Sequence, residues 1–152
     1  MNENKKRIET VKDFQTSINL SYDLFNENKI KNFIPTKEAI KILEQLLTGV
    51  FENNTNKARI LTGAYGRGKS HIVLVFLSLL MRKDINIFKN LLGKIKIYNE
   101  DFYNFIFNYL KNGKKYFPII VNGGNISLEQ SFLLGLEEAL KREDIFLSLI
   151  HI

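Results

Sequence analysis

Eight consecutive residues, 63–70, have the types and the spacing that would hold a chain of phosphates. They read Gly63-Ala64-Tyr65-Gly66-Arg67-Gly68-Lys69-Ser70 and fit the pattern G-x-x-x-x-G-K-[ST] at each fixed position. Glycine allows backbone turns that a Cβ would obstruct, and successive N–H groups in such turns bind anions. Lys69 would place a compact positive charge on the outer phosphates, and the Ser70 hydroxyl would bind Mg²⁺.

The segments on either side of these residues are typical of a strand and a helix. Residues 59–62 are short and β-compatible, and residues 72–81 are apolar almost all round, which predicts a helix buried against a sheet. The start of such a helix offers the positive end of its dipole to phosphates. We therefore expect ATP and Mg²⁺ to be the ligands, with Ser70 on the metal. The residues expected to contact the nucleotide are Gly63, Ala64, Tyr65, Gly66, Arg67, Gly68, Lys69, Ser70 and His71.

Residues 59–81 resemble the P-loop NTPases, in which this pattern is the Walker A loop. The resemblance implies an α/β fold, a three-layer sandwich with a mostly parallel sheet and the loop after its first core strand, as in AAA-like ATPases. It also implies that residues 33–36 border the adenine. Asn122 follows another expected strand, at the sheet edge where ligands bind, and would approach the γ-phosphate or its water. Ordinary roles stay open for both, a turn with a helix cap at residues 33–36 and a turn-forming Asn122.

The composition is that of an ordinary globular domain. At 152 residues the chain is long enough for one domain with a real core, and the absence of cysteine excludes a disulfide framework and a thiolate site. No apolar segment follows the N-terminus, and the longest apolar run, residues 72–81, is too short to cross a bilayer. We expect a cytoplasmic protein without a membrane partner. The net charge of +6 comes from dispersed lysines, which favours solvated surface charge and leaves DNA contact at most indirect.

Periodicity predicts the remaining elements. Residues 18–24 alternate like a strand, with an extended arm as the alternative, and residues 26–32 are turn-rich. Helices are expected at 37–51 after the N-cap Thr36, at 85–92 closed by Gly93, at 100–111, and at 128–142 after Ser127. A strand is expected at 116–121. The stripe of Phe102, Phe105, Ile106 and Tyr109 has the spacing of a buried helix face, which we prefer to a base-stacking surface.

We expect three parts along the chain: a lead-in with a helix at residues 1–57, a partial nucleotide-binding core at 58–146, and a tail at 147–152. Residues 145–152 read as a buried strand. However, the letters Leu-Ser-Leu-Ile-His-Ile of residues 147–152 also look like a translated sequencing adapter from a transposon end, which we prefer. The chain would then be the N-terminal part of a longer protein, with its nucleotide-binding core incomplete at the C-terminus.

Two parts of an ATPase are missing from the sequence. No apolar strand that ends in a carboxylate follows Ser70, and no arginine finger can be placed. We therefore expect the whole protein to be an ATPase but this chain alone to be inactive. The alternatives are a module that binds nucleotide without hydrolysis and a P-loop kinase, although no acceptor-site carboxylate pair lies near the loop.

Residues 33–36, residues 60–71 and the Asn-Gly turn at residue 122 are together similar to the start of large bacterial ATP-binding proteins of phage-defence islands, including the ATPase of BREX-type systems. The resemblance implies ATP-driven work in a defence assembly that acts on DNA, with other subunits of that assembly as partners. Only Gly63, Gly66, Gly68, Lys69 and Ser70 carry a functional role over from it.

Overall fold

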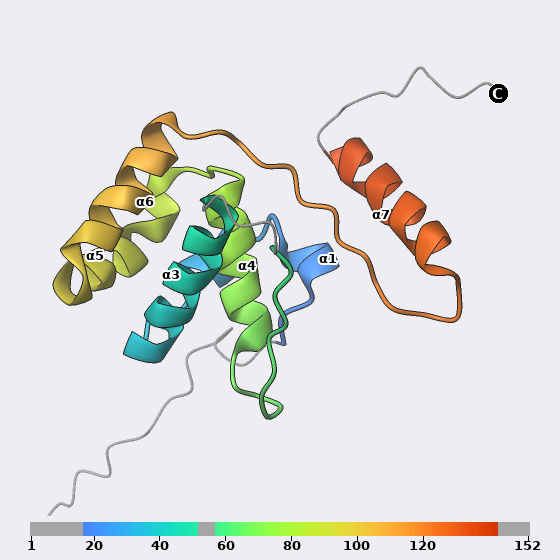
Figure 1. The fold of residues 1–152 in the computed structure, drawn as a ribbon, viewed down its shortest axis with the longest axis horizontal. Helices are drawn as coiled ribbons and strands as arrows, with labels where there is room; N and C mark the ends of the chain where they lie inside the picture. The colour runs from blue at the N-terminus through green and yellow to red at the C-terminus, as the bar shows by residue number, and fades with distance from the viewer. Residues whose placement is uncertain (1–16, 52–56, 143–152) are drawn as a thin grey trace, which may run out of the picture.

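A central pair of helices, α3 (Lys37–Phe51) and α4 (Lys69–Leu80), organises the chain in a computed structural model that describes residues 17–51 and 57–142 (Figure 1). The other elements are α1 (Leu20–Asp23), α2 (Glu27–Lys31), the 3₁₀-helix η1 (Ile85–Phe88), α5 (Lys89–Tyr98), α6 (Glu100–Asn112) and α7 (Leu128–Arg142). Completely buried Leu43 of α3, Leu74 and Leu79 of α4 and Ile95 of α5 lie in one continuous core.

The predicted α/β sandwich is wrong, because the described residues form helices and contain no strand. Residues 57–62 and 114–122 are free of helix, as expected, but no backbone hydrogen bond joins these two segments. Instead, the Tyr116 N–H donates to the carbonyl of Leu80 at the end of α4, at 3.0 Å. A strand exists only when a second strand pairs with it, and short apolar runs do not specify that pairing.

Local hydrogen bonds explain the second correction, a helix where a strand was expected at residues 18–24. The Asn19 side chain accepts from the Ser21 N–H at 3.1 Å, and the Asp23 carboxylate accepts from the Asn19 N–H at 2.8 Å. These reciprocal bonds close a helical turn that outweighs the weak alternation of seven residues. In the same way, Asn26 caps α2 within the segment expected to be a turn.

Four predicted helices, observed as α3, α4, α6 and α7, are confirmed, and a fifth is corrected. Thr36 caps α3, Ser127 caps α7, and α6 buries Phe102, Ile106 and Tyr109 as predicted, while Phe105 lies at its exposed edge. The helix expected to close at Gly93 instead continues to residue 98 as α5, after the 3₁₀ turn η1. The prediction that Gly93 ends the helix is wrong, because Gly93 lies inside α5 and does not take the positive φ of a left-handed helix end.

The helix α7 stands apart from the core (Figure 1). Its buried residues are the small Ser131, Gly135 and Ala139, spaced four apart on one face. A Cβ added to Gly135 would lie 2.6 Å from the carbonyl oxygen of Ile120, so the extended segment presses directly on this face. The expected tail, residues 147–152, lies outside the described residues.

Candidate phosphate-binding site

The glycines of the predicted loop adopt the backbone conformations for which glycine is suited. Gly63, Gly66 and Gly68 have φ values of 149°, 77° and 75°. A Cβ added to Gly66 or Gly68 would meet nothing within 4 Å, so the backbone angle and not crowding favours glycine. The loop between the extended segment and α4 thus turns sharply and repeatedly.

The start of α4 is left without a side-chain cap. Gly68 is its N-cap residue, and the first helical bond runs from the Ile72 N–H to the Gly68 carbonyl at 3.0 Å. The N–H groups of residues 69–71 therefore have no acceptor within the helix. By contrast, α3, α6 and α7 are capped by the side chains of Thr36, Asn99 and Ser127. These amides of α4 are available to an outside acceptor.

The charged side chains within the loop and the first turn of α4 are all positive. Arg67 and Lys69 lie at the positive end of the α4 dipole, and the first turn carries no acidic residue. Cations are unfavourable at this end of a helix by some tenths of a kcal/mol each, up to about 1 kcal/mol. An anion bound at the same place would interact favourably with both the dipole and these cations, so the arrangement favours an anionic ligand.

Lys69 is already turned toward the loop. Its Nζ donates to the carbonyl oxygens of Gly63 and Ala64, at 2.7 Å each. These two bonds tie the two ends of the turn together and hold the ammonium group over it. Since an ammonium group has three donors, one N–H of Lys69 remains for a ligand.

The next two side chains differ in their surroundings. Ser70 is exposed in the first turn of α4. The Nε2 atom of His71 lies 2.6 Å from the carbonyl oxygen of Lys29. Because a carbonyl oxygen only accepts, Nε2 carries the proton and donates it. The His71 ring also packs edge-on against Phe33, with centroids 5.1 Å apart. The structure therefore gives His71 contacts that anchor α4 to the segment around α2.

The other residues singled out from the sequence are placed as follows. Phe33 is buried next to His71, and Thr36 accepts from the Ala39 N–H, so both have structural contacts at the start of α3. Asn122 donates through Nδ2 to the Ser21 hydroxyl of α1 at 3.1 Å. Tyr65, at the tip of the loop, is completely exposed.

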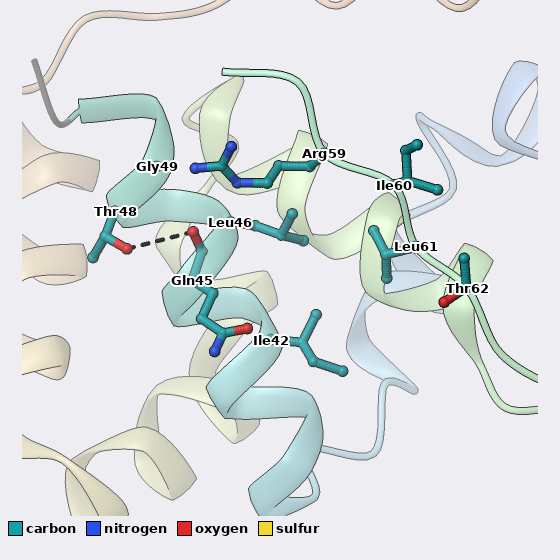
Figure 2. Close-up of a pocket in the computed structure, with 9 residues that line it drawn as sticks. All are labelled: Ile42, Gln45, Leu46, Thr48, Gly49, Arg59, Ile60, Leu61 and Thr62. Carbon is teal, nitrogen blue, oxygen red and sulfur yellow. Dashed lines mark hydrogen bonds between the residues drawn. The ribbon is translucent and has the colours of Figure 1, made fainter. Parts of the chain in front are cut away.

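Sequence reasoning missed a groove beside the segment that leads into the loop (Figure 2). The groove has a volume of about 490 Å³ and lies between α3 and residues 59–62. The Arg59 guanidinium crosses it, and a Cβ on Gly49 would come within 2.9 Å of Arg59 Nη2. A glycine inside an otherwise amphipathic helix was the available signal of such a close approach.

Scans against known protein families, curated proteins and solved structures returned no match for this chain. The candidate site therefore stands on its own geometry. Within the described ranges, no group of three or more His, Cys, Asp or Glu side chains gathers to hold a metal ion. In the same ranges no helix has the length and apolar character needed to cross a membrane.

Proposed function

We propose that residues 63–70 bind the phosphates of ATP together with Mg²⁺. The observation that carries the proposal is the helix start itself: uncapped N–H groups follow three glycines with positive φ, and the charged groups beside them, Arg67 and Lys69, are cations. Oriented amides at the positive end of a helix dipole form a binding site for a phosphate group.

Each group in the loop has a distinct role in this proposal. The N–H groups of residues 69–71 donate to phosphate oxygens, and the third N–H of Lys69 does the same with a full positive charge. The Ser70 hydroxyl is the side-chain ligand for Mg²⁺, which neutralises phosphate charge when bound. His71 holds α4 in place through Lys29 and Phe33 and acts on the loop only indirectly.

The corrected fold leaves this proposal standing. The binding groups belong to a turn and to one helix start, and both are present in the described residues. A sheet would position such a loop from behind but would contribute no donor to the phosphates. Here the burial of Ile72, Leu74 and Val75 against the core fixes the direction of α4 instead.

Titration calorimetry with Mg-ATP tests the proposal. Lys69→Ala should weaken binding by about tenfold or more, because a charge-assisted hydrogen bond contributes about 1.5–3 kcal/mol. Lys94→Ala, which removes an exposed lysine from α5, is the matched control and should bind as the parent does. Ser70→Ala should make binding depend less on Mg²⁺. Equal affinity of the Lys69 variant and the parent would remove Lys69 from the site.

The wider role that we propose, ATP-driven work in a phage-defence assembly on DNA, rests only on the resemblance of residues 33–36, residues 60–71 and the Asn-Gly turn at residue 122. A module that binds nucleotide without hydrolysis is the second candidate, favoured by the lack of an apolar strand with a terminal carboxylate after Ser70. The two candidates differ in whether bound ATP is cleaved.

A further inference from the structure

The phosphate site leaves the base of the nucleotide without an assigned place. The resemblance implies that residues 33–36 border the adenine. However, Phe33 and Pro35 are buried and Thr36 caps α3, so these side chains already serve the fold. The groove between α3 and residues 59–62 lies beside the chain that leads into the loop (Figure 2). Its volume of about 490 Å³ falls within the range of about 300–1,000 Å³ that is usual for small-molecule sites.

The groove begins next to the phosphate site. Thr62 lines the groove, and the carbonyl of the next residue, Gly63, accepts a hydrogen bond from Lys69 Nζ at 2.7 Å. Since successive Cα atoms are about 3.8 Å apart, the groove and the ammonium group that would contact phosphate meet at neighbouring residues. A nucleotide whose phosphates contact the loop can therefore place its base in this groove.

Apolar side chains line both walls of the groove. Ile42 and Leu46 belong to α3, and Leu61 belongs to the extended segment. Leu46 is buried, and the other two are partly buried against the core. A flat aromatic ring between these walls would lose contact with water on both of its faces. The polar edge of the ring would still need hydrogen-bond partners.

The Gln45 side chain offers such partners. It is exposed on α3, and no hydrogen bond engages its amide in the part of the chain that the structure describes. Figure 2 shows it beside Ile42, whereas the Arg59 guanidinium lies at the other end of the groove, beside Gly49. An amide matches the N6–H donor and the N7 acceptor of adenine with two hydrogen bonds, but guanine presents two acceptors, O6 and N7, on the same edge. The amide therefore favours adenine.

We propose that the groove between α3 and residues 59–62 holds the adenine base of the bound nucleotide, and that Gln45 selects adenine over guanine. The proposal rests on phosphate binding by residues 63–70, because the loop brings the nucleotide to the groove. The base packs between the apolar walls, and its N6–N7 edge bonds to the Gln45 amide. These contacts involve no charged group, so salt should weaken phosphate binding without changing the preference for adenine.

Titration calorimetry of the full chain with Mg-ATP, Mg-GTP and Mg-tripolyphosphate separates the base site from the phosphate site. The parent should bind Mg-ATP about tenfold more tightly than Mg-GTP, because a bidentate pair discriminates between bases by about that factor or more. Gln45→Leu should weaken Mg-ATP binding about tenfold, remove the preference over Mg-GTP and leave Mg-tripolyphosphate binding unchanged. Gln130→Leu, which removes an exposed glutamine from α7, is the matched control and should bind all three ligands as the parent does.

Each proposal fails in a different way. Equal affinity of the parent for Mg-ATP and Mg-GTP, with tripolyphosphate bound, would overturn the base site and leave the phosphate site standing. Equal weakening of all three ligands by Gln45→Leu would also overturn it, since the substitution would then act through the loop. Absence of binding by both Mg-ATP and Mg-tripolyphosphate would remove the phosphate site and the base site together.

NMR of the unmodified chain keeps the test decisive even if Gln45→Leu disturbs folding. The side-chain amide signals of Gln45 should shift when Mg-ATP is added and should stay in place with Mg-tripolyphosphate. Unchanged Gln45 signals at saturating Mg-ATP would overturn the proposal.

Discussion

Gly68 shows at the scale of single residues how backbone conformation prepares a site. Its φ of 75° lies in the left-handed region, where a side chain costs about 1–2 kcal/mol, although the space around it is open. The same residue ends the loop and leaves α4 uncapped. Its role is therefore conformational, and a residue that disfavours the left-handed region, such as alanine, would weaken it.

We predict that Gly68→Ala destabilises the fold by about 1–2 kcal/mol and weakens Mg-ATP binding. Gly93→Ala is the matched control. Gly93 lies within α5, a Cβ there meets nothing within 4 Å, and alanine should stabilise that helix by about 0.5–1 kcal/mol. Urea denaturation of both variants measures the difference. Equal stability of the Gly68 variant and the parent would show that the loop relaxes without a positive φ.

Tyr109 links three parts of the core through its hydroxyl. The oxygen lies 2.9 Å from the Leu80 carbonyl and 2.7 Å from the Lys114 carbonyl. Burial raises the pKa of Tyr109 from 10.0 to about 12, with Tyr116 adding to the rise and Arg82 opposing it. The protonated phenol is thus the form that the folded state favours.

We predict an alkaline loss of stability that depends on Tyr109. Because the folded pKa is above the unfolded one, its contribution is complete below pH 10 and is lost as the pH rises toward about 12. Tyr109→Phe should cost about 1 kcal/mol at neutral pH and should flatten the decline between those values. Thermal unfolding across the range measures it, with Tyr22→Phe, an exposed ring, as control. Parallel pH profiles for parent and Tyr109→Phe would refute the assignment.

Arg82 organises the contact between elements at the end of α4. It has a positive φ of 50°, which ends the helix, and its guanidinium donates to the carbonyls of Leu110 and Gly113 at the end of α6. One residue therefore stops one helix and caps another. Among the described residues, the packing of α7 has no such hydrogen bonds at its centre. There the small residue Gly135 lies directly against the backbone of Ile120 in the extended segment.

We predict that Gly135→Ala loosens α7 without unfolding the core. A Cβ there would lie 2.6 Å from the Ile120 carbonyl oxygen, so the helix must move away. Hydrogen exchange should accelerate in α7 and stay unchanged in α4. Leu134→Ala, on the exposed face of α7, should change exchange in neither helix. Faster exchange in α4 as well would place α7 within the cooperative core.

The whole described molecule is a helical core with an attached helix and two extended segments. The core fixes the direction of α4 and therefore the position of the candidate phosphate site. Binding the phosphates of ATP and cleaving them need different groups. Binding needs only the donors of the loop and of the α4 start. Cleavage also needs an aligned water and a group that stabilises the transition-state charge.

We predict that the chain does not turn ATP over. The sequence after Ser70 contains no apolar strand ending in a carboxylate to orient metal or water. Phosphate release from purified monomer should equal that of Lys69→Ala, even if the parent binds ATP. Robust release by the parent that Lys69→Ala abolishes would show that a catalytic carboxylate exists elsewhere in the chain.

The sequence alone determined the elements whose signals are local. Thr36 and the apolar spacing after it predicted α3 with its observed bounds, Ser127 did the same for α7, and the glycine spacing located the turns before α4. These features depend on bonds between residues three or four apart, so nearby residue types suffice to specify them.

Only the tertiary structure decided the fold class and the neighbours of the site. Residues 59–62 and 116–121 look like strands, but a strand forms only with a partner distant in sequence, and the described chain supplies none. Two side-chain contacts are likewise long-range. His71 bonds to the carbonyl of Lys29, 42 residues away, and Arg82 bonds to the carbonyl of Leu110, 28 residues away. Periodicity carries no information on which distant groups meet, because that depends on how complete surfaces pack together.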